Sequence, residues 1–233
     1  MSGILYGIGV GPGDPELLTL KAVKIMKACD VLLLPSAPKE ECYAYNIVYE
    51  AVPEIREKEF VCKPFPMIKD PDKLAAAHDK IYGEIETYLD NGKKVAFLTI
   101  GDPSVYSTYS YIHARALRRG KDAIIVSGVP SFCAVAARLG IPLGDNRNEI
   151  HVIPGSYAVE ETMSLKGTRV YMKSGKKLEE LRQKLRAENA SGELDVYAVS
   201  NCGMPDEKVT EGLENLDIQS GYLTIVIVKE HME

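Results

Sequence analysis

One strand and the turn that follows it constrain the fold of this chain more than any other stretch. Residues 94–100 hold five apolar side chains in seven, which predicts a buried strand, and Gly101-Asp102-Pro103 ends it. A helical pattern starts near Tyr109; Pro103 suits a first helical turn, and Asp102 can cap a helix or accept hydrogen bonds from a ligand. Ligands bind at the carboxyl ends of strands in open α/β sheets, so this turn is a candidate site as well as a plain connection.

The same alternation of strand and helix runs through the first half of the chain. Apolar runs that predict strands lie at residues 4–10, 31–34 and 59–62, and helical patterns separate them. Strands that alternate with helices form parallel sheets, so this half predicts a largely parallel α/β domain. A further strand at 123–126 leads into a second turn of the same type, Ser127-Gly128-Val129-Pro130-Ser131.

The second half is richer in strands, and one strong helix interrupts them at 177–188. Its predicted strands are residues 150–153, 168–172, 195–199 and 222–228. Parallel neighbours need long crossovers, so strands with so few helices between them predict a mixed sheet. The polar residues 118–121 mark a boundary, and we expect two α/β domains, 1–120 and 121–233, with the active-site cleft between them.

The composition indicates which partners and which cell compartment to expect. The formal net charge is -5, which offers no general attraction for nucleic acid or an anionic membrane. No apolar run reaches the roughly 20 residues of a membrane span, and the first residues lack a signal-peptide pattern, so we expect a cytoplasmic protein. The five cysteines form no Cys-x-x-Cys pair and the four histidines show no ligand spacing, which predicts reduced thiols and no protein-bound metal.

Residues 9–15 form a loop of three glycines and two prolines after the first strand. Its N–H groups can face an anion, but no Gly-Lys-Ser/Thr sequence closes it, so it is not a P-loop. Pro12 and Asp14 also fall inside the pattern, which makes it a poor dinucleotide fingerprint. Asp14 is a candidate helix cap or ligand contact.

Four motifs together resemble one known family. They are residues 9–22, which begin Gly-Val-Gly-Pro-Gly-Asp-Pro, then Gly101-Asp102-Pro103, then Gly128-Val129-Pro130-Ser131, then Gly140-Ile141-Pro142-Leu143. In order and spacing they resemble the tetrapyrrole (corrin/porphyrin) methylases over essentially the whole chain. The narrower stretch 99–109 resembles the precorrin-2 C-20 methyltransferase branch, which includes the cobalt-factor II enzymes.

The resemblance implies a homodimer of two-domain subunits that binds S-adenosylmethionine in the cleft and a tetrapyrrole in a trough above it. The positions that match the family's cofactor site, together with Tyr106, which we place at the ligand, are Pro12, Ile100, Gly101, Asp102, Val105, Tyr106, Pro130, Ser131, Met172, Cys202, Thr224 and Ile225. Two departures stand out. The family often has Pro-Gly-Val-Thr-Ser at residues 127–131, so a threonine hydroxyl is missing here, and Cys202 replaces a residue that is often small.

A tetrapyrrole substrate carries many carboxylates, whereas this chain is acidic, so local positive charge must bind it. The candidate substrate residues are Gly11, Gly13, Asp14, Arg115, Arg147 and Lys173. We expect at least one of Arg115, Arg147 and Lys173 to contact a substrate carboxylate. For each of them alone, a solvated surface charge is the competing interpretation.

The expected reaction is methyl transfer from the sulfonium to C-20 of precorrin-2 or cobalt-factor II. It requires an in-line arrangement of carbon, methyl and sulfur and no metal. Loss of the C-20 proton needs a base if the protein supplies one; Asp14, Asp102 and Tyr106 are the candidates, and each also has a binding or structural interpretation. Three rivals stay open: a sister enzyme such as the uroporphyrinogen-III methyltransferase, a ribosomal RNA methyltransferase of the same fold, and a non-catalytic binding module.

Overall fold

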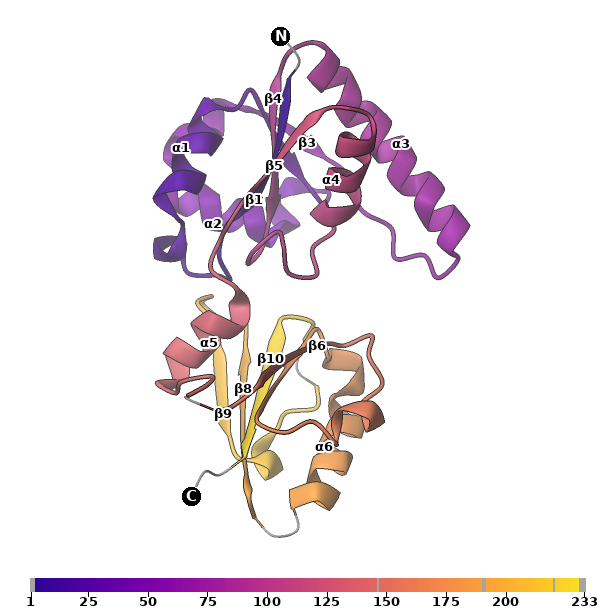
Figure 1. Cartoon of the computed structure of the whole chain (residues 1–233). Helices are drawn as coiled ribbons and strands as arrows, with labels where there is room; N and C mark the ends of the chain where they lie inside the picture. Colours follow the sequence, from indigo (N-terminus) through magenta and orange to yellow (C-terminus); the bar gives the residue numbers. More distant parts are fainter. Residues whose placement is uncertain (1–2, 146, 190–191, 220, 231–233) are drawn as a thin grey trace. The chain divides into compact units, whose positions relative to one another are not determined.

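The computed structural model describes residues 3–145, 147–189, 192–219 and 221–230. It divides into two compact units, residues 1–130 and 131–233 (Figure 1). The division lies ten residues after the boundary expected at 120, because the strand Asp122–Val126 (β5) pairs in parallel with Ile4–Gly9 (β1) and so belongs to the first sheet. The polar stretch before β5 is therefore a loop within the first unit.

The first unit is a five-stranded parallel sheet in the order β3-β2-β4-β1-β5. The remaining strands are Val31–Leu34 (β2), Glu59–Cys62 (β3) and Lys94–Thr99 (β4). The helices that connect them are Leu20–Ala28 (α1), Tyr43–Ala51 (α2), Pro71–Asp90 (α3) and Tyr109–Arg118 (α4). The largely parallel sheet predicted from the alternating pattern is confirmed.

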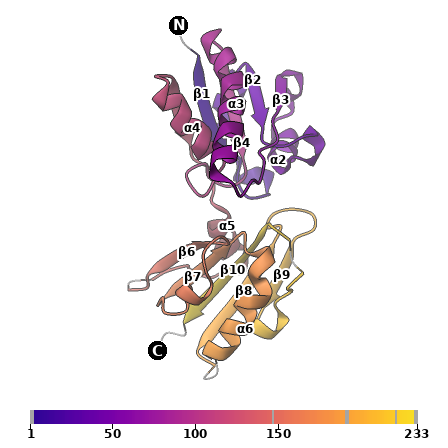
Figure 2. The same cartoon turned by 90° about the vertical axis from the view of Figure 1, so that its right-hand side faces the viewer.

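Helices cover both faces of this sheet, and the side chains of β4 show why. Ala96 and Leu98 point into a core shared with α1 and α2, whereas Val95 and Phe97 point into a second core shared with α3 and α4. Figures 1 and 2 show these helix pairs on opposite sides of the sheet. A strand that is buried on both faces has a continuous run of apolar residues, and this run is the pattern that predicted β4 from the sequence.

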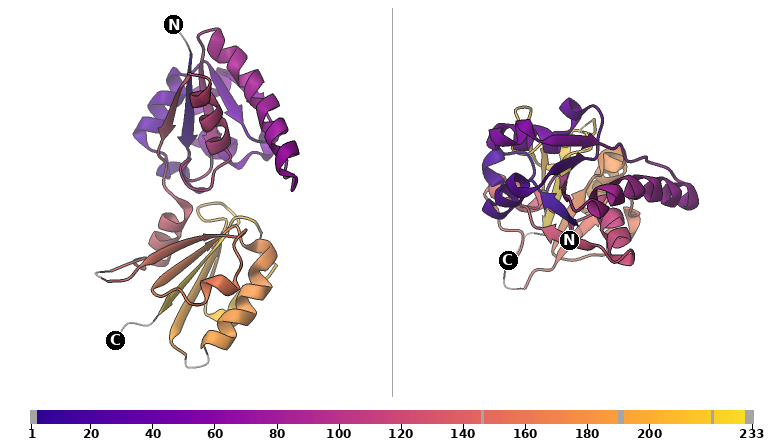
Figure 3. Two further views of the ribbon diagram at one scale, coloured as in Figure 1. Left: turned by 45° about the vertical axis from the view of Figure 1, so that its right-hand side comes forward. Right: turned by 90° about the horizontal axis from the view of Figure 1, so that it is seen from above.

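The second unit holds a mixed sheet in the order β6-β7-β10-β8-β9. Its strands are Ile150–Pro154 (β6), Thr168–Met172 (β7), Leu194–Ser200 (β8), Lys208–Glu211 (β9) and Thr224–Glu230 (β10). Only β6 and β7 pair in parallel; β10 runs antiparallel to β7 and β8, and β9 antiparallel to β8. The mixed sheet predicted for this half is confirmed. Its helices, Ser131–Leu139 (α5) and Leu178–Glu188 (α6), lie on opposite sides of the sheet (Figure 3).

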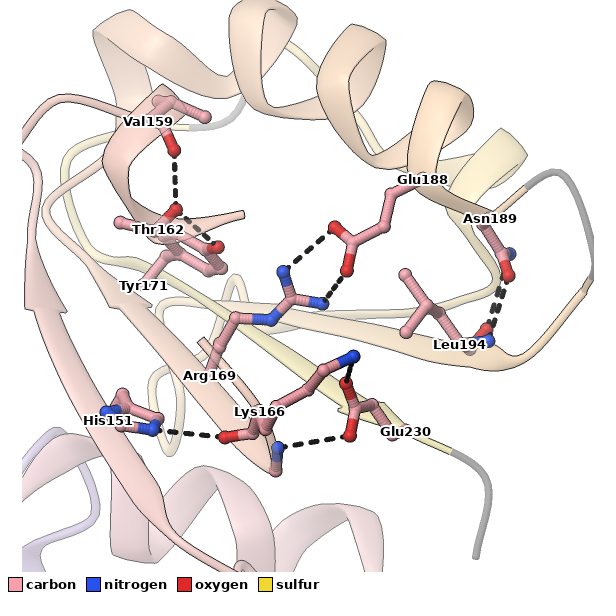
Figure 4. Close-up of polar contacts among 11 residues, drawn as sticks. His151, Val159, Thr162, Lys166, Arg169, Tyr171, Glu188, Asn189, Leu194 and Glu230 are labelled. Carbon is pink, nitrogen blue, oxygen red and sulfur yellow. Dashed lines mark hydrogen bonds and ion pairs between the residues drawn. The ribbon is translucent and has the colours of Figure 1, made fainter. Parts of the chain in front are cut away.

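A buried ion pair joins this sheet to α6. The Arg169 side chain on β7 is fully buried, and its two terminal nitrogens donate to the two carboxylate oxygens of Glu188 at 2.9 and 2.8 Å (Figure 4). Beside it, Tyr171 and Thr162 share a buried hydroxyl–hydroxyl hydrogen bond of 2.9 Å. Arg169 thus fixes the last turn of α6, while Leu178, Leu181 and Leu185 fix the rest through the apolar core.

Within the described residues, no helix combines the length and apolar character that crossing a membrane requires.

Candidate functional site

The connections of the first sheet change faces at one place on its carboxyl edge. β1 and β4 are parallel neighbours. The chain leaves β1 toward α1 on one face and leaves β4 toward α4 on the other. Where neighbouring strands send their chains to opposite faces, the two loops diverge and leave room for a ligand. The loop after β1 and the Gly101-Asp102-Pro103 turn after β4 lie at this point.

Backbone hydrogen bonds hold these two loops together. The Gly101 N–H donates to the Gly11 carbonyl at 2.8 Å, and the Gly11 N–H donates to the Gly101 carbonyl at 3.4 Å. Both residues have a positive φ, 78° at Gly11 and 71° at Gly101. Glycine adopts this conformation without steric cost, which explains the glycine at each position.

A third loop, the one that follows β5, packs against the same point. A Cβ atom on Gly128 would lie 2.3 Å from the Gly101 carbonyl oxygen, and one on Gly9 would lie 2.5 Å from it. No real Cβ atom comes so close, so the three backbones meet only because these positions carry no side chain. The glycine motifs of the sequence therefore build one three-loop junction.

Asp102 ties the junction together with both carboxylate oxygens. Oδ2 accepts the Gly128 N–H at 3.0 Å, and Oδ1 accepts the Ser104 N–H at 2.8 Å and its hydroxyl at 2.5 Å. The side chain is buried. Donors within its own unit already occupy both oxygens, so this geometry favours a positioning role for Asp102 over that of a general base.

The other expected residues of this unit lie in the junction loops, at a helix cap and at an exposed turn. Pro12, Gly13, Ile100, Val105 and Pro130 lie in the three loops of the junction and are buried or half-buried. Asp14 accepts the Glu16 N–H at 2.8 Å and so caps a short 3-10 helix, Pro15–Leu17. Tyr106 has φ of 45°, rare for a side chain of its size, and 48% of it is exposed. Strained residues of this kind cluster at functional sites, which supports its place at a ligand.

Arg115, a candidate for substrate binding, makes contacts between two helices of the first unit. It lies in the second half of α4, where its Nε donates to the Asp79 carboxylate at 2.6 Å. Its terminal nitrogens donate to the carbonyls of Tyr111 and Ala75 at 3.0 Å each. Its side chain is only 12% exposed, so Arg115 clamps α4 to α3, and its contacts do not support a role in substrate binding.

In the second unit the expected cofactor residues gather at one end of the sheet. Met172 on β7 pairs with Ile225 on β10, and the neighbouring Thr224 pairs with Ser200 on β8, two residues before Cys202. Two non-glycine residues with positive φ stand at this end: Lys173 at 56° and Asn201 at 53°. Ser131 opens α5, and Arg147 is exposed in the segment before β6.

Thr224 is fully buried, and two hydrogen bonds satisfy its hydroxyl group. Its hydroxyl donates to the Gly221 carbonyl at 2.8 Å, so it accepts the hydroxyl proton of Ser200 at 2.9 Å. Thr224 therefore has no proton left for a ligand and holds Ser200 and the turn before β10. The Lys173 ammonium lies 5.6 Å from the centre of the Tyr222 ring, in the range of a cation–π contact.

Comparisons with known proteins decide the family. The family model described as Tetrapyrrole (Corrin/Porphyrin) Methylases matches residues 4–216. This chain belongs to the tetrapyrrole methylases. A Methanocaldococcus jannaschii protein named probable cobalt-precorrin-2 C(20)-methyltransferase is 35% identical over 231 residues, covering 97% of this chain and 95% of that protein.

A second relative and a solved structure extend this comparison. A Sinorhizobium protein named precorrin-2 C(20)-methyltransferase is 30% identical over 246 residues and covers 98% of this chain and 97% of its own. The crystal structure of a cobalt precorrin-4 methyltransferase has the same fold, with a TM-score of 0.77 at 21% identity, over 97% of this chain and 94% of that one. The resemblance seen in the sequence motifs is confirmed.

Sequence patterns missed two groups in this methylase. Thr99 and Ser107 share a buried hydroxyl–hydroxyl hydrogen bond of 3.0 Å beneath the Gly101 turn, and Ser107 also accepts the Tyr109 N–H. Glu207 links the turn that carries Cys202 to Arg138, 69 residues earlier in the chain. Hydroxyls within a loop hinted at the first group, but no local pattern signals the second. The described residues contain no group of histidine, cysteine and acidic side chains suited to a metal ion.

Proposed function

We propose that this methylase transfers a methyl group from S-adenosylmethionine to C-20 of precorrin-2 or of its cobalt-containing counterpart. The observation that carries the proposal is the intact three-loop junction of Gly9, Gly101 and Gly128 at the switch point of the first sheet. Two relatives with names for C-20 methylation, at 35% and 30% identity over nearly the full chain, support this choice of ring position.

In the first unit, the proposed cofactor contacts are Ile100, Gly101 and Val105 of the junction loops. In the second unit, the proposed contacts are Met172 and Ile225, which pair at one end of the sheet. These side chains are small or apolar, which suits the base and the aliphatic arm of a nucleoside linked to an amino acid. When bound, S-adenosylmethionine supplies a methyl group on a positively charged sulfur.

The chain's own contribution to the reaction is positioning and exclusion of water. C-20 of the reduced ring is already electron-rich through its neighbouring nitrogens, so holding it in line with the sulfonium supplies most of the acceleration. Asp102 shapes the loop, and Tyr106 lays its half-exposed ring against the ligand. Among the basic candidates, Lys173 and Arg147 remain for substrate carboxylates, since Arg115 is held between two helices.

The homodimer also remains part of the proposal. β5 is an edge strand of the first sheet, and Ile124 and Ile125 on its two faces are each 40% exposed. Exposed edge strands with apolar side chains pair readily with another chain, so a second copy is a natural partner for this edge. Light scattering on the purified protein should give twice the chain mass, and Ile125→Lys should lower it; a wild-type monomer would exclude the dimer.

An anaerobic methyl-transfer assay tests the activity. Labelled S-adenosylmethionine is offered with precorrin-2 and, separately, with its cobalt-containing counterpart, and the labelled carbon is located by NMR. We expect the label at C-20 with at least one substrate, and the preferred substrate shows whether cobalt is inserted before this step. Label at another ring carbon would keep a tetrapyrrole methylase but overturn C-20 as its target. Cofactor binding without any transfer would favour a binding module.

A further inference from the structure

The turn between β8 and β9 carries Cys202 and is closed by its own hydrogen bonds. The Asn201 N–H donates to the Leu223 carbonyl at 3.1 Å, which fixes the start of the turn beside β10. The Asn201 side-chain amide donates to Asp206 at 2.6 Å across the turn. Asn201 itself has φ of 53°, so the backbone bends sharply just before Cys202. A strained, closed turn places one side chain accurately, provided that something holds the turn in place.

Glu207 provides that hold from the other end of the turn. One carboxylate oxygen accepts the Gly203 N–H at 2.8 Å, and the other accepts the Arg138 Nε–H at 2.5 Å. The Cys202 thiol also hydrogen-bonds this carboxylate. Burial alone would raise the pKa of Glu207, but the bonds from Gly203, Arg138 and Cys202 outweigh it and bring the pKa below its ordinary value.

Arg138 makes this contact more than a local loop bond, because it lies in the last turn of α5. The same helix begins at Ser131. A rigid helix transmits position along its length, so whatever fixes Arg138 also fixes Ser131, roughly 10 Å away at 1.5 Å per residue. Ser131 and Cys202 both belong to the proposed cofactor set, and a single carboxylate sets the distance between the segments that carry them.

We infer that Glu207 is a positioning residue for methyl transfer, which locks the Cys202 turn to α5 and thereby fixes two segments of the cofactor site against each other. The inference rests on the proposed function. The competing interpretation is an ordinary surface ion pair, which contributes little to stability and nothing specific to the site. The Glu207 side chain is only 18% exposed, and its three donors converge from two separate segments, which favours the positioning role.

Glu207→Gln tests the inference with almost no change in shape. An amide cannot accept from both Gly203 and Arg138, because one of its two ends carries N–H groups. We expect the affinity for S-adenosylmethionine, measured by calorimetry, to fall about tenfold, with KM for the cofactor rising by the same factor and kcat changing less. Cys202 should also become several-fold more reactive toward iodoacetamide, as followed by peptide mass spectrometry in the native protein.

Glu214→Gln is the matched control, because Glu214 pairs with Arg186 on the exposed surface of the same unit. It should leave the affinity, KM and Cys202 labelling at the wild-type level. Arg138→Gln is a second variant, which frees α5 while Glu207 keeps its bonds to Gly203 and Cys202. It should raise KM for the cofactor with little change in Cys202 labelling.

The outcomes separate this inference from the function on which it rests. Wild-type affinity and wild-type Cys202 labelling in Glu207→Gln would overturn the positioning role while the enzyme's activity stands. Equal losses in Glu207→Gln and Glu214→Gln would also overturn it, because they would reveal a general effect of charge. A wild-type protein that binds no S-adenosylmethionine would overturn the proposed function first and this inference with it.

Discussion

Asp102 is the side chain on which the three-loop junction depends most. Its two carboxylate oxygens accept from Gly128 on one loop and Ser104 on another. In Asp102→Asn, one oxygen becomes an N–H group that faces a donor, and a buried N–H loses its acceptor. Leaving such a group unpaired costs about 1–3 kcal/mol. We expect cofactor affinity to fall about tenfold to a hundredfold in calorimetric titration.

Asp70→Asn is the control for this change, because Asp70 caps α3 through the N–H groups of Asp72 and Lys73, and its ion pair with the Lys73 side chain is exposed. Asparagine caps helices as well as aspartate does, so this variant should bind the cofactor like the wild type. An Asp102→Asn protein with unchanged affinity would show that the loops hold their positions without the carboxylate.

The burial of His78 predicts that the first unit loses stability in acid. It is 3% exposed and stacks on Tyr111 with ring centres 4.7 Å apart, and its other neighbours are Phe65, Arg115 and Asp79. Burial lowers its pKa, the positive Arg115 lowers it further, and Asp79 opposes the shift. The unfolded chain therefore takes up a proton near pH 6.5 while the folded one does not.

Stability is fully present above about pH 6.5 and falls below it, by at most about 1.4 kcal/mol per pH unit for this group. His78→Phe keeps the stacked ring and removes the proton, so its stability should fall less steeply between pH 6.5 and 5. Hydrogen exchange in α3, compared with the same variant at pH 7.5, measures the difference. Parallel pH profiles would contradict the assignment; some slope will persist because burial also lowers the pKa of His113.

At the scale of elements, β1 and α4 fit together through the absence of one side chain. Gly7 on β1 faces the ring of Tyr109, which is fully buried at the start of α4. A Cβ atom on Gly7 would lie 2.2 Å from the ring. Gly7→Ala should therefore lower the free energy of unfolding by about 3 kcal/mol, as overpacking of a core does.

Gly83→Ala is the matched control for this change. A Cβ atom at this exposed position of α3 meets nothing within 4 Å, and alanine favours a helix over glycine by roughly 1 kcal/mol. The two substitutions should thus have opposite signs in urea unfolding. Tyr109→Leu should be less harmful in the Gly7→Ala background than alone, because the smaller side chain makes room. Additive effects would mean that the two positions do not compete for space.

Local patterns revealed most elements of this fold but not their partners. Apolar runs predicted the buried strands β1, β2 and β4, and helical spacing of apolar residues predicted α4 and α6. The edge strand β9 was not predicted, because Lys208-Val209-Thr210-Glu211 is short, mostly exposed and has no run of apolar residues. β5 was assigned to the wrong side of the boundary because pairing with β1, over 100 residues earlier, leaves no local trace.

The same limit applies to the site. Glycine motifs indicated the loops of the junction, because only glycine lets three backbones come into contact. This requirement determines the residue type at each single position, so it is visible in the sequence. The role of a charged side chain depends instead on what lies opposite it. Arg115 resembled a substrate ligand in the sequence, yet its partners are Asp79 and the Ala75 carbonyl on α3 and the Tyr111 carbonyl on its own helix. No local pattern indicated a role for Glu207, because its partner Arg138 lies 69 residues away in the chain.

For the whole molecule, the connection between the two units starts from a fixed point. The chain passes from β5 to α5 through residues 127–130, and Gly128 is bound to Asp102. The Thr19 hydroxyl, which caps α1, also donates to the Ser127 carbonyl at 3.4 Å. The first unit therefore holds the connection up to Gly128, and Val129 and Pro130 are the residues that remain before the second unit begins.

Bound S-adenosylhomocysteine should slow hydrogen exchange in both units. If cofactor residues come from the junction and from the Met172 end of the second sheet, the bound product should slow hydrogen exchange at residues 101–105 and at 172–173 and 224–225 together. At a hundredfold excess over its Kd it should add about 2.7 kcal/mol to the free energy of unfolding. Asp102→Asn, at the same ligand concentration, should lose protection in both units, because a shared ligand leaves both when its affinity falls. Protection confined to the first unit would show that the second unit's residues do not contribute, and the proposed cofactor set would shrink to the three loops around Gly101.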